Sequence, residues 1–147
     1  MANALSQIEQ LAERFLTMPW VALAARSAVA LPFLLSGIAK TLDFDGAVAE
    51  VRGLTGFEPA ALFAVLVIIT QLGGSALLIA GGRLTWIGSA ALAGFTVIAT
   101  LYAHAFWRMP PAEQFINRNT FFEHVALVGA LVLVAVLAAR PIKNGSR

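Results

Sequence analysis

The chain has 147 residues, of which 59 % are hydrophobic and 12 % are charged, and its formal net charge at pH 7 is +2. Ordinary soluble domains carry about 25 % charged residues, so this composition, with a mean hydropathy of +0.81, indicates an integral membrane protein of one domain. The small, scattered positive charge argues against a nucleic-acid partner, and the absence of cysteine excludes disulfides and thiol redox chemistry on this chain.

The N-terminal segment, residues 1–19, is predicted to hold an amphipathic helix over residues 3–17. The segment lacks the basic start and the small-residue cleavage site of a secretory signal peptide. We expect the helix to lie on the membrane surface, with a water-exposed leader as the alternative because the helix is not basic. Its apolar residues recur at helical spacing on one face: Leu5, Ile8, Leu11, Ala12, Phe15 and Leu16.

Four apolar stretches are each long enough to cross a bilayer, which takes about 20 residues. Small residues within them allow close helix approach in lipid, and the Gly-Gly-Arg turn at residues 81–83 can join only antiparallel neighbours. The predicted spans cover residues 20–40, 60–80, 84–107 and 121–139.

Two polar stretches connect these spans. Residues 41–59 keep a helical apolar spacing, which predicts a short surface helix that starts near Asp43 or Asp45 and ends by Gly53 or Gly56. Residues 108–120 contain two prolines and several polar side chains, and we predict a polar loop there.

The predicted fold is therefore all-α: an integral membrane four-helix bundle with an N-terminal amphipathic helix. The transmembrane domain would cover residues 20–140, followed by a basic tail over residues 141–147. Four spans place both termini on one side of the membrane. Slightly more Lys and Arg residues lie on that side, which favours cytoplasmic termini by the positive-inside rule.

In this topology, polar side chains from several spans fall near the outer face. Lys40 ends the first span, His104 lies near the end of the third, and Glu123 and His124 open the fourth. Gln71 lies deeper, near the middle of the membrane. Because ionisable groups at membrane depth usually face the bundle interior, we interpret these five residues as a candidate ligand-binding pocket.

Each of these residues also has a structural interpretation. Lys40 could anchor the end of its span at the interface, Glu123 could pair with Lys40 or Arg118, and Gln71 could hydrogen-bond a neighbouring helix. Arg26, on the same helical stripe as Lys40, is expected to be a structural anchor near the inner boundary. Two histidines and one acid without a short ligand motif predict no metal site, and no catalytic or cofactor-binding motif is present.

The order and spacing of several short motifs resemble the DoxX family over about residues 20–138. The resemblance implies a four-helix bacterial inner-membrane protein, with relatives that are membrane subunits of a thiosulfate:quinone oxidoreductase or are linked to oxidative-stress systems. The motifs are Arg26-x6-Phe33-x3-Gly37-x2-Lys40, Gln71-Leu72-Gly73-Gly74, Gly81-Gly82-Arg83, His104-x-Phe106-Trp107 and Phe122-Glu123-His124.

The resemblance implies a membrane subunit or accessory protein of a redox, quinone-linked or oxidative-stress process. A quinone is then the candidate cofactor, and a redox protein or a second copy of the chain is the candidate partner besides the lipid bilayer. If the chain takes part in catalysis, it would do so as an oxidoreductase subunit. Relatives often carry an acid in place of Gln71 and Lys-Asn in place of Glu123-His124, so any proton transfer by that acid is not available here.

Two other functions stay open from the sequence. A non-catalytic membrane scaffold or assembly factor would recruit a partner through the N-terminal helix and the outer loop. Small-solute transport is less favoured, because four spans are few for a carrier and no inverted repeat is visible.

Overall fold

The computed structural model describes residues 2–139, with side chains from residue 5 onward, and this part of the chain is helical without strands. The predicted basic tail at residues 141–147 lies outside the described residues. In chain order the elements are α1 (Ala2–Leu16), α2 (Pro19–Leu42), α3 (Phe44–Thr55), α4 (Ala60–Ala80), the 3-10 turn η1 (Gly82–Leu84), α5 (Thr85–Ala103), the 3-10 turn η2 (Phe106–Arg108) and α6 (Pro111–Ala139).

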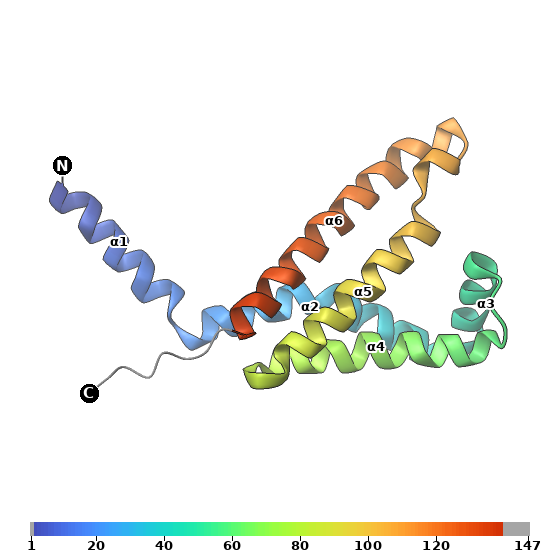
Figure 1. Ribbon diagram of the computed structural model, residues 1–147, viewed down its shortest axis with the longest axis horizontal. Coiled ribbons are helices and arrows are strands. Elements are labelled where there is room, and N and C mark those ends of the chain that lie inside the picture. The colour runs from blue at the N-terminus through green and yellow to red at the C-terminus, as the bar shows by residue number, and fades with distance from the viewer. Residues whose placement is uncertain (1, 140–147) are drawn as a thin grey trace.

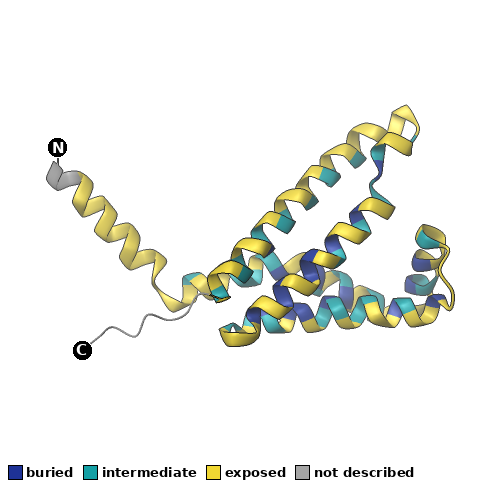
Figure 2. Cartoon of the chain, viewed as in Figure 1, coloured by how far each residue is buried: buried dark blue, intermediate teal, exposed yellow. Residues whose placement is uncertain are grey.

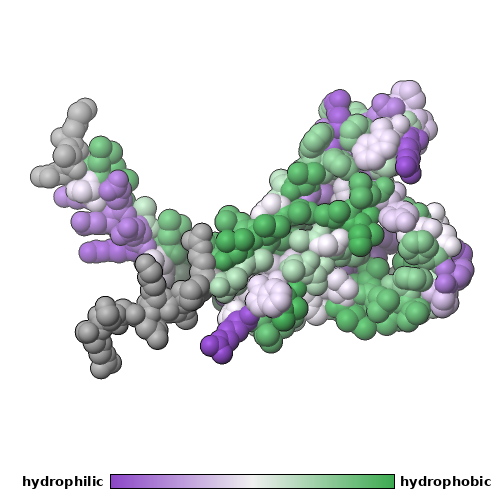
Figure 3. All heavy atoms as spheres, viewed as in Figure 1, coloured by the Kyte–Doolittle hydropathy of each residue, from purple (hydrophilic) through white to green (hydrophobic). Residues whose placement is uncertain are grey.

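Within residues 2–139, four helical segments are long and apolar enough to cross a membrane: α2, α4, α5 with its flanking 3-10 turns, and α6. This confirms the four predicted spans, and α4 has the bounds predicted for the second one. Most of the large apolar side chains on these helices are exposed. Figure 3 shows them along the helices, with hydrophilic side chains gathered at α1, near α3 and at the α5–α6 connection. An apolar surface of this extent is suited to lipid rather than to water.

The predicted polar loop over residues 108–120 is wrong for most of its length, because α6 begins at Pro111. Proline is favoured in the first turn of a helix, since its missing N–H has no partner there. The acidic Glu113 in the same turn suits the positive end of the helix dipole. At about 1.5 Å per residue, the 29 residues of α6 extend roughly 44 Å, so its polar first turns reach beyond the hydrocarbon core.

α1 is a helix as predicted, and it stands apart from the other helices (Figure 1). Its apolar face is exposed along its length, with Leu5, Ile8 and Leu11 each more than 60 % exposed (Figure 2). A single aromatic contact spans the corner to α2, where the rings of Phe15 and Trp20 meet edge to face at 5.4 Å. Apart from this contact at Phe15, the apolar face of α1 is left uncovered by the described residues.

The long helices pack as a chain of neighbours, with α2 beside α4, α4 beside α5 and α5 beside α6, while α2 and α6 have little contact. They converge on a common core that includes Ala30, Leu78, Leu92 and Leu131. Figure 2 shows the buried residues concentrated at this crossing. Beyond it, the α2–α4 pair and the α5–α6 pair diverge toward the end that carries α3 and the α5–α6 connection (Figure 1), here named the distal end.

Glycines make the close approaches within the core possible. A Cβ at Gly74 would lie 2.7 Å from Leu92 Cγ, and a Cβ at Gly88 would lie 2.7 Å from the Gly74 carbonyl oxygen. Both distances are shorter than a real Cβ contact. α4 and α5 can therefore come this close only because these two positions are glycines. This is the small-residue packing expected between helices in lipid.

α3 covers the distal end of the α2–α4 pair. The Asp43 carboxylate accepts a hydrogen bond from the Gly46 N–H at 2.9 Å, which caps the start of α3, and Gly56 ends it in a left-handed conformation with φ 68°. Both ends therefore lie where the sequence predicted them. Ala47 and Val51 bury their side chains against the first turns of α4.

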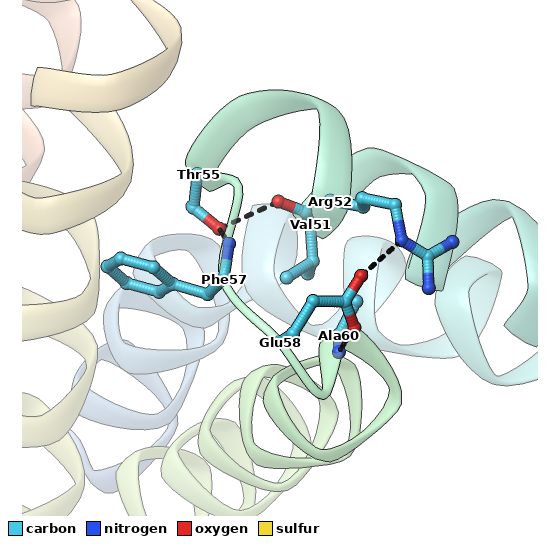
Figure 4. Close-up of polar contacts among 6 residues, drawn as sticks. All are labelled: Val51, Arg52, Thr55, Phe57, Glu58 and Ala60. Carbon is cyan, nitrogen blue, oxygen red and sulfur yellow. Dashed lines mark hydrogen bonds and ion pairs between the residues drawn. The ribbon is translucent and has the colours of Figure 1, made fainter.

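The connection from α3 to α4 is held by polar contacts (Figure 4). Glu58 accepts a hydrogen bond from Arg52 Nε at 2.6 Å and another from the Ala60 N–H at 2.8 Å. Thr55 Oγ1 accepts from the Phe57 N–H at 3.1 Å. Together these contacts cap α4 and fix the position of α3 over the space between the helix pairs.

Candidate functional site

A cavity of about 770 Å³ lies between the diverging helix pairs on the side of α3. This volume is in the range of small-molecule sites, about 300–1,000 Å³. Five helices, α2 to α6, contribute to its wall, which is mostly apolar and includes Phe33, Phe63, Phe95 and Leu127. The cavity therefore offers an apolar space with a few polar side chains at its edge.

Four of the five residues that the sequence singled out line this cavity: Lys40, Gln71, His104 and His124. Glu123 does not, because its side chain is exposed on α6. Adjacent residues on a helix point about 100° apart, so the residue next to His124 faces another direction. Sequence proximity alone could not separate the two.

Lys40 forms an ion pair with Glu50 of α3, with Nζ and Oε2 2.6 Å apart. The lysine side chain is 16 % exposed and the glutamate side chain 47 %. The partner of Lys40 is therefore Glu50 and not Glu123, which the sequence suggested. The pair joins the distal end of α2 to α3, and it leaves the cavity without an unpaired lysine charge.

Gln71 lies deeper in the cavity wall and is only 4 % exposed. Its Nε2 donates to Ser36 Oγ of α2 at 3.1 Å, whereas its Oε1 is buried without a hydrogen-bond partner among the described residues. Gly37 makes this contact possible, because a Cβ there would lie 2.7 Å from Leu72 Cδ2 and 3.3 Å from Gln71 Cβ. Ser36 was missed in the sequence, although it directly precedes this glycine.

The two histidines meet where α5 and α6 approach the distal end. Their ring centroids are 5.1 Å apart and the rings stand edge to face. His104 Nδ1 lies 2.9 Å from Asn117 Oδ1, and His124 Nδ1 lies 2.8 Å from Thr100 Oγ1. Asn117 and Thr100 thus orient the imidazoles, and neither was singled out from the sequence.

The neighbouring hydrogen bonds determine which nitrogen of His124 is protonated. Thr100 Oγ1 donates its proton to the Thr96 carbonyl at 2.6 Å, so it can only accept from the imidazole. The neutral His124 ring therefore carries its proton on Nδ1 and keeps a lone pair on Nε2.

The same argument holds for His104. Asn117 Nδ2 donates to the Glu113 carbonyl at 3.0 Å, which leaves the amide oxygen facing the imidazole. His104 must then donate from Nδ1, and its Nε2 is also an acceptor in the neutral form. Two oriented imidazoles with free Nε2 atoms can accept hydrogen bonds or protons from a ligand.

Arg26 lies away from the cavity, near the end of α4. Its Nη2 donates to the Ile79 carbonyl at 3.5 Å. Gly81, which has φ 76°, leaves room for the guanidinium, since a Cβ there would lie 2.9 Å from Arg26 Cζ. The helix dipole favours a cation at the last carbonyls of a helix. The contact of Arg26 with Ile79 therefore stabilises the packing of α2 on α4 at the end opposite the cavity.

Comparison with known proteins gives two matches. A sequence model of the DoxX family matches residues 21–105, which is more than half of the chain. The inner membrane protein YphA of Escherichia coli (strain K12) is 28 % identical over 118 residues, covering 80 % of this chain and 83 % of that protein. No solved structure matches the chain. The family match includes Lys40, Gln71 and His104 and ends before α6.

Proposed function

The chain belongs to the DoxX family of integral membrane proteins, and on this premise we propose that it is a membrane subunit or accessory protein of a redox process linked to quinones or oxidative stress. The distal cavity would be its ligand site. The observation that carries the proposal is this cavity, in which Lys40, Gln71, His104 and His124 from four segments of the chain line one mostly apolar space.

The composition of the wall supports a lipid-soluble ligand with a polar head. Apolar side chains would hold a ring or a hydrocarbon chain, while a few polar groups would fix its orientation. A quinone fits this description, since its ring is apolar and its two carbonyl oxygens accept hydrogen bonds.

The histidines support an exchange of protons with such a ligand. Reduction of a quinone to a quinol takes up two electrons and two protons. The Nε2 lone pair of His104 or His124 would take up a proton from a quinol hydroxyl, and the charged imidazole would return it to a quinone oxygen. The electrons would come from a partner redox protein, because the sequence has no cysteine and no cofactor motif of its own.

We also propose that the protein lies in a bacterial inner membrane. The similar protein from Escherichia coli is named an inner membrane protein, and we place this chain in the same kind of membrane. With both termini in the cytoplasm, the distal end and the cavity would lie on the periplasmic side.

Binding of a short-chain quinone to the full-length protein in lipid nanodiscs tests this function. We expect saturable binding of the quinone and, under reducing anaerobic conditions, of its quinol. His104→Ala and His124→Ala should each lose about 5-fold in affinity for the quinol, since the histidine Nε2 accepts one hydrogen bond of about 1 kcal/mol from a quinol hydroxyl. Glu123→Ala is the matched control, because this exposed residue adjoins His124 outside the cavity. No saturable binding, or equal affinities in all four proteins, would refute the assignment.

The alternative function is a non-catalytic scaffold or assembly factor. The exposed apolar face of α1 favours it, because the described chain covers this face only at Phe15, next to Trp20. In that case a fixed partner would co-purify with the protein. The partner would be lost on deletion of residues 3–17, and it would be retained in the two histidine variants.

A further inference from the structure

A buried amide at the deep end of the cavity has an unused hydrogen-bonding atom. Gln71 is 4 % exposed and lines the cavity, yet its Oε1 has no hydrogen-bond partner. A buried polar atom without a partner destabilises a protein. Because Gln71 lines the cavity, a rotation of its amide toward a molecule that enters there would give this buried atom a hydrogen bond.

Ser36, the hydrogen-bond partner of the Gln71 amide, can act as an acceptor or as a donor. Gln71 Nε2 donates to Ser36 Oγ at 3.1 Å, and a serine hydroxyl can either accept or donate. If the amide turns over, Ser36 donates to Oε1 and Nε2 becomes free to donate. The same two residues can thus offer the cavity an acceptor or a donor without any change in charge.

The charges around the cavity favour a neutral group at this position. Gln71 and Ser36 are uncharged, and the lysine in the wall, Lys40, is already paired with Glu50 at 2.6 Å. A carboxylate or phosphate at this depth would leave water without gaining a free cation, which is unfavourable. A carbonyl or a hydroxyl group would lose less hydration free energy and would gain a hydrogen bond to the Gln71 amide.

We propose that Ser36 and Gln71 form the deep subsite of the cavity and bind one oxygen of a lipid-soluble ligand both as a carbonyl and as a hydroxyl. The inference rests on the proposed function and extends it. It states that the site holds the oxidised and the reduced form of the ligand, by turning the Gln71 amide over. Ser36 holds the amide in either orientation and is a positioning residue.

The test uses full-length protein in nanodiscs, titrated with a short-chain quinone and, under reducing anaerobic conditions, with its quinol. The wild-type protein should bind both forms with affinities within about 3-fold of each other. Gln71→Met, which keeps the length of the side chain but removes its polar atoms, should lose about 10-fold for both forms.

Two further variants complete the test. Ser36→Ala should weaken both forms by a smaller factor, about 3-fold, because the amide is no longer held. Gln10→Met is the matched control, since it is the same substitution at an exposed residue of α1 outside the cavity, and it should bind both forms like the wild type. Circular dichroism and size-exclusion chromatography show that each variant is folded.

The outcomes separate the two proposals. If the wild-type protein binds neither form, the proposed function fails. If it binds both and Gln71→Met binds equally well, the subsite is wrong while the proposed function stands. A loss confined to one form in Gln71→Met, or unchanged binding in Ser36→Ala, would overturn the two-way role of the amide.

Discussion

Gly88 marks a close backbone approach between α4 and α5, and its replacement by alanine gives a sharp test of the packing. An added Cβ would lie 2.7 Å from the Gly74 carbonyl oxygen, 2.8 Å from Leu77 Cβ and 3.2 Å from the Leu78 nitrogen. These atoms belong to the backbone of α4 or are attached directly to it. Rotation of a side chain therefore cannot relieve the overlap, and the two helices must move apart.

The size of the effect follows from the distances. An ordinary C···O contact is about 3.3 Å, so the helices must separate by roughly 0.6 Å at this point. Overpacking of this kind costs about 1–3 kcal/mol, whereas alanine gains at most about 1 kcal/mol over glycine in a helix. We expect Gly88→Ala to lower the free energy of unfolding by about 1–2 kcal/mol.

Gly73→Ala is the matched control, because it is the same substitution in the interior of α4 and meets nothing within 4 Å. Unfolding of both full-length variants by sodium dodecyl sulfate in mixed micelles, followed by circular dichroism, gives the comparison. Gly73→Ala should equal the wild type or exceed it slightly. Equal stabilities of the two variants would refute the close contact of α4 and α5 at Gly88.

Two other predictions concern the surface of the protein. The hydrogen bond from Arg52 holds the pKa of the Glu58 carboxyl below its ordinary value. The small contribution of this pair to stability is therefore present above the ordinary glutamate pKa, and it is lost as the pH falls through the lowered pKa. Between about pH 7 and about pH 3, the thermal midpoint should therefore fall more for the wild type than for Glu58→Gln, and identical pH profiles would contradict the pairing. The second prediction is that α1 lies on the lipid surface. Leu11→Cys and Gln10→Cys each introduce a single cysteine into a chain that has none, and a fluorophore is attached to it in protein reconstituted into vesicles. The label at 11 should be quenched by lipid-borne quenchers and the label at 10 by aqueous iodide, whereas equal access of iodide to both would place α1 in water.

The four spans could be predicted from the sequence because a bilayer imposes a length and a composition on each of them. Residues 60–80 were predicted without error for this reason. The segment at residues 108–120 was mistaken for a loop, since the polar turns of a helix that leaves the hydrocarbon core have the composition of a loop. Pro111 was the available signal, because proline often occupies the first turn of a helix.

The candidate site could be predicted only in part. Hydropathy and topology brought Lys40 and the histidines to one end of the molecule, because depth along a span can be counted in residues. The partners of these residues depend on how helices are rotated and on where α3 lies, which the sequence does not encode locally. Glu50 was therefore missed as the partner of Lys40, and Thr100 and Asn117 were missed beside the histidines.

The weak contact between α2 and α6 has a consequence for how the cavity is closed. Their separation is set through α4 and α5 rather than by direct packing, so in a bilayer we expect acyl chains of neighbouring lipids to complete the wall of the cavity. The saturation and length of the lipid chains would then form part of the surroundings of a ligand in the proposed site. We therefore expect ligand affinity to differ between a detergent micelle and a native membrane.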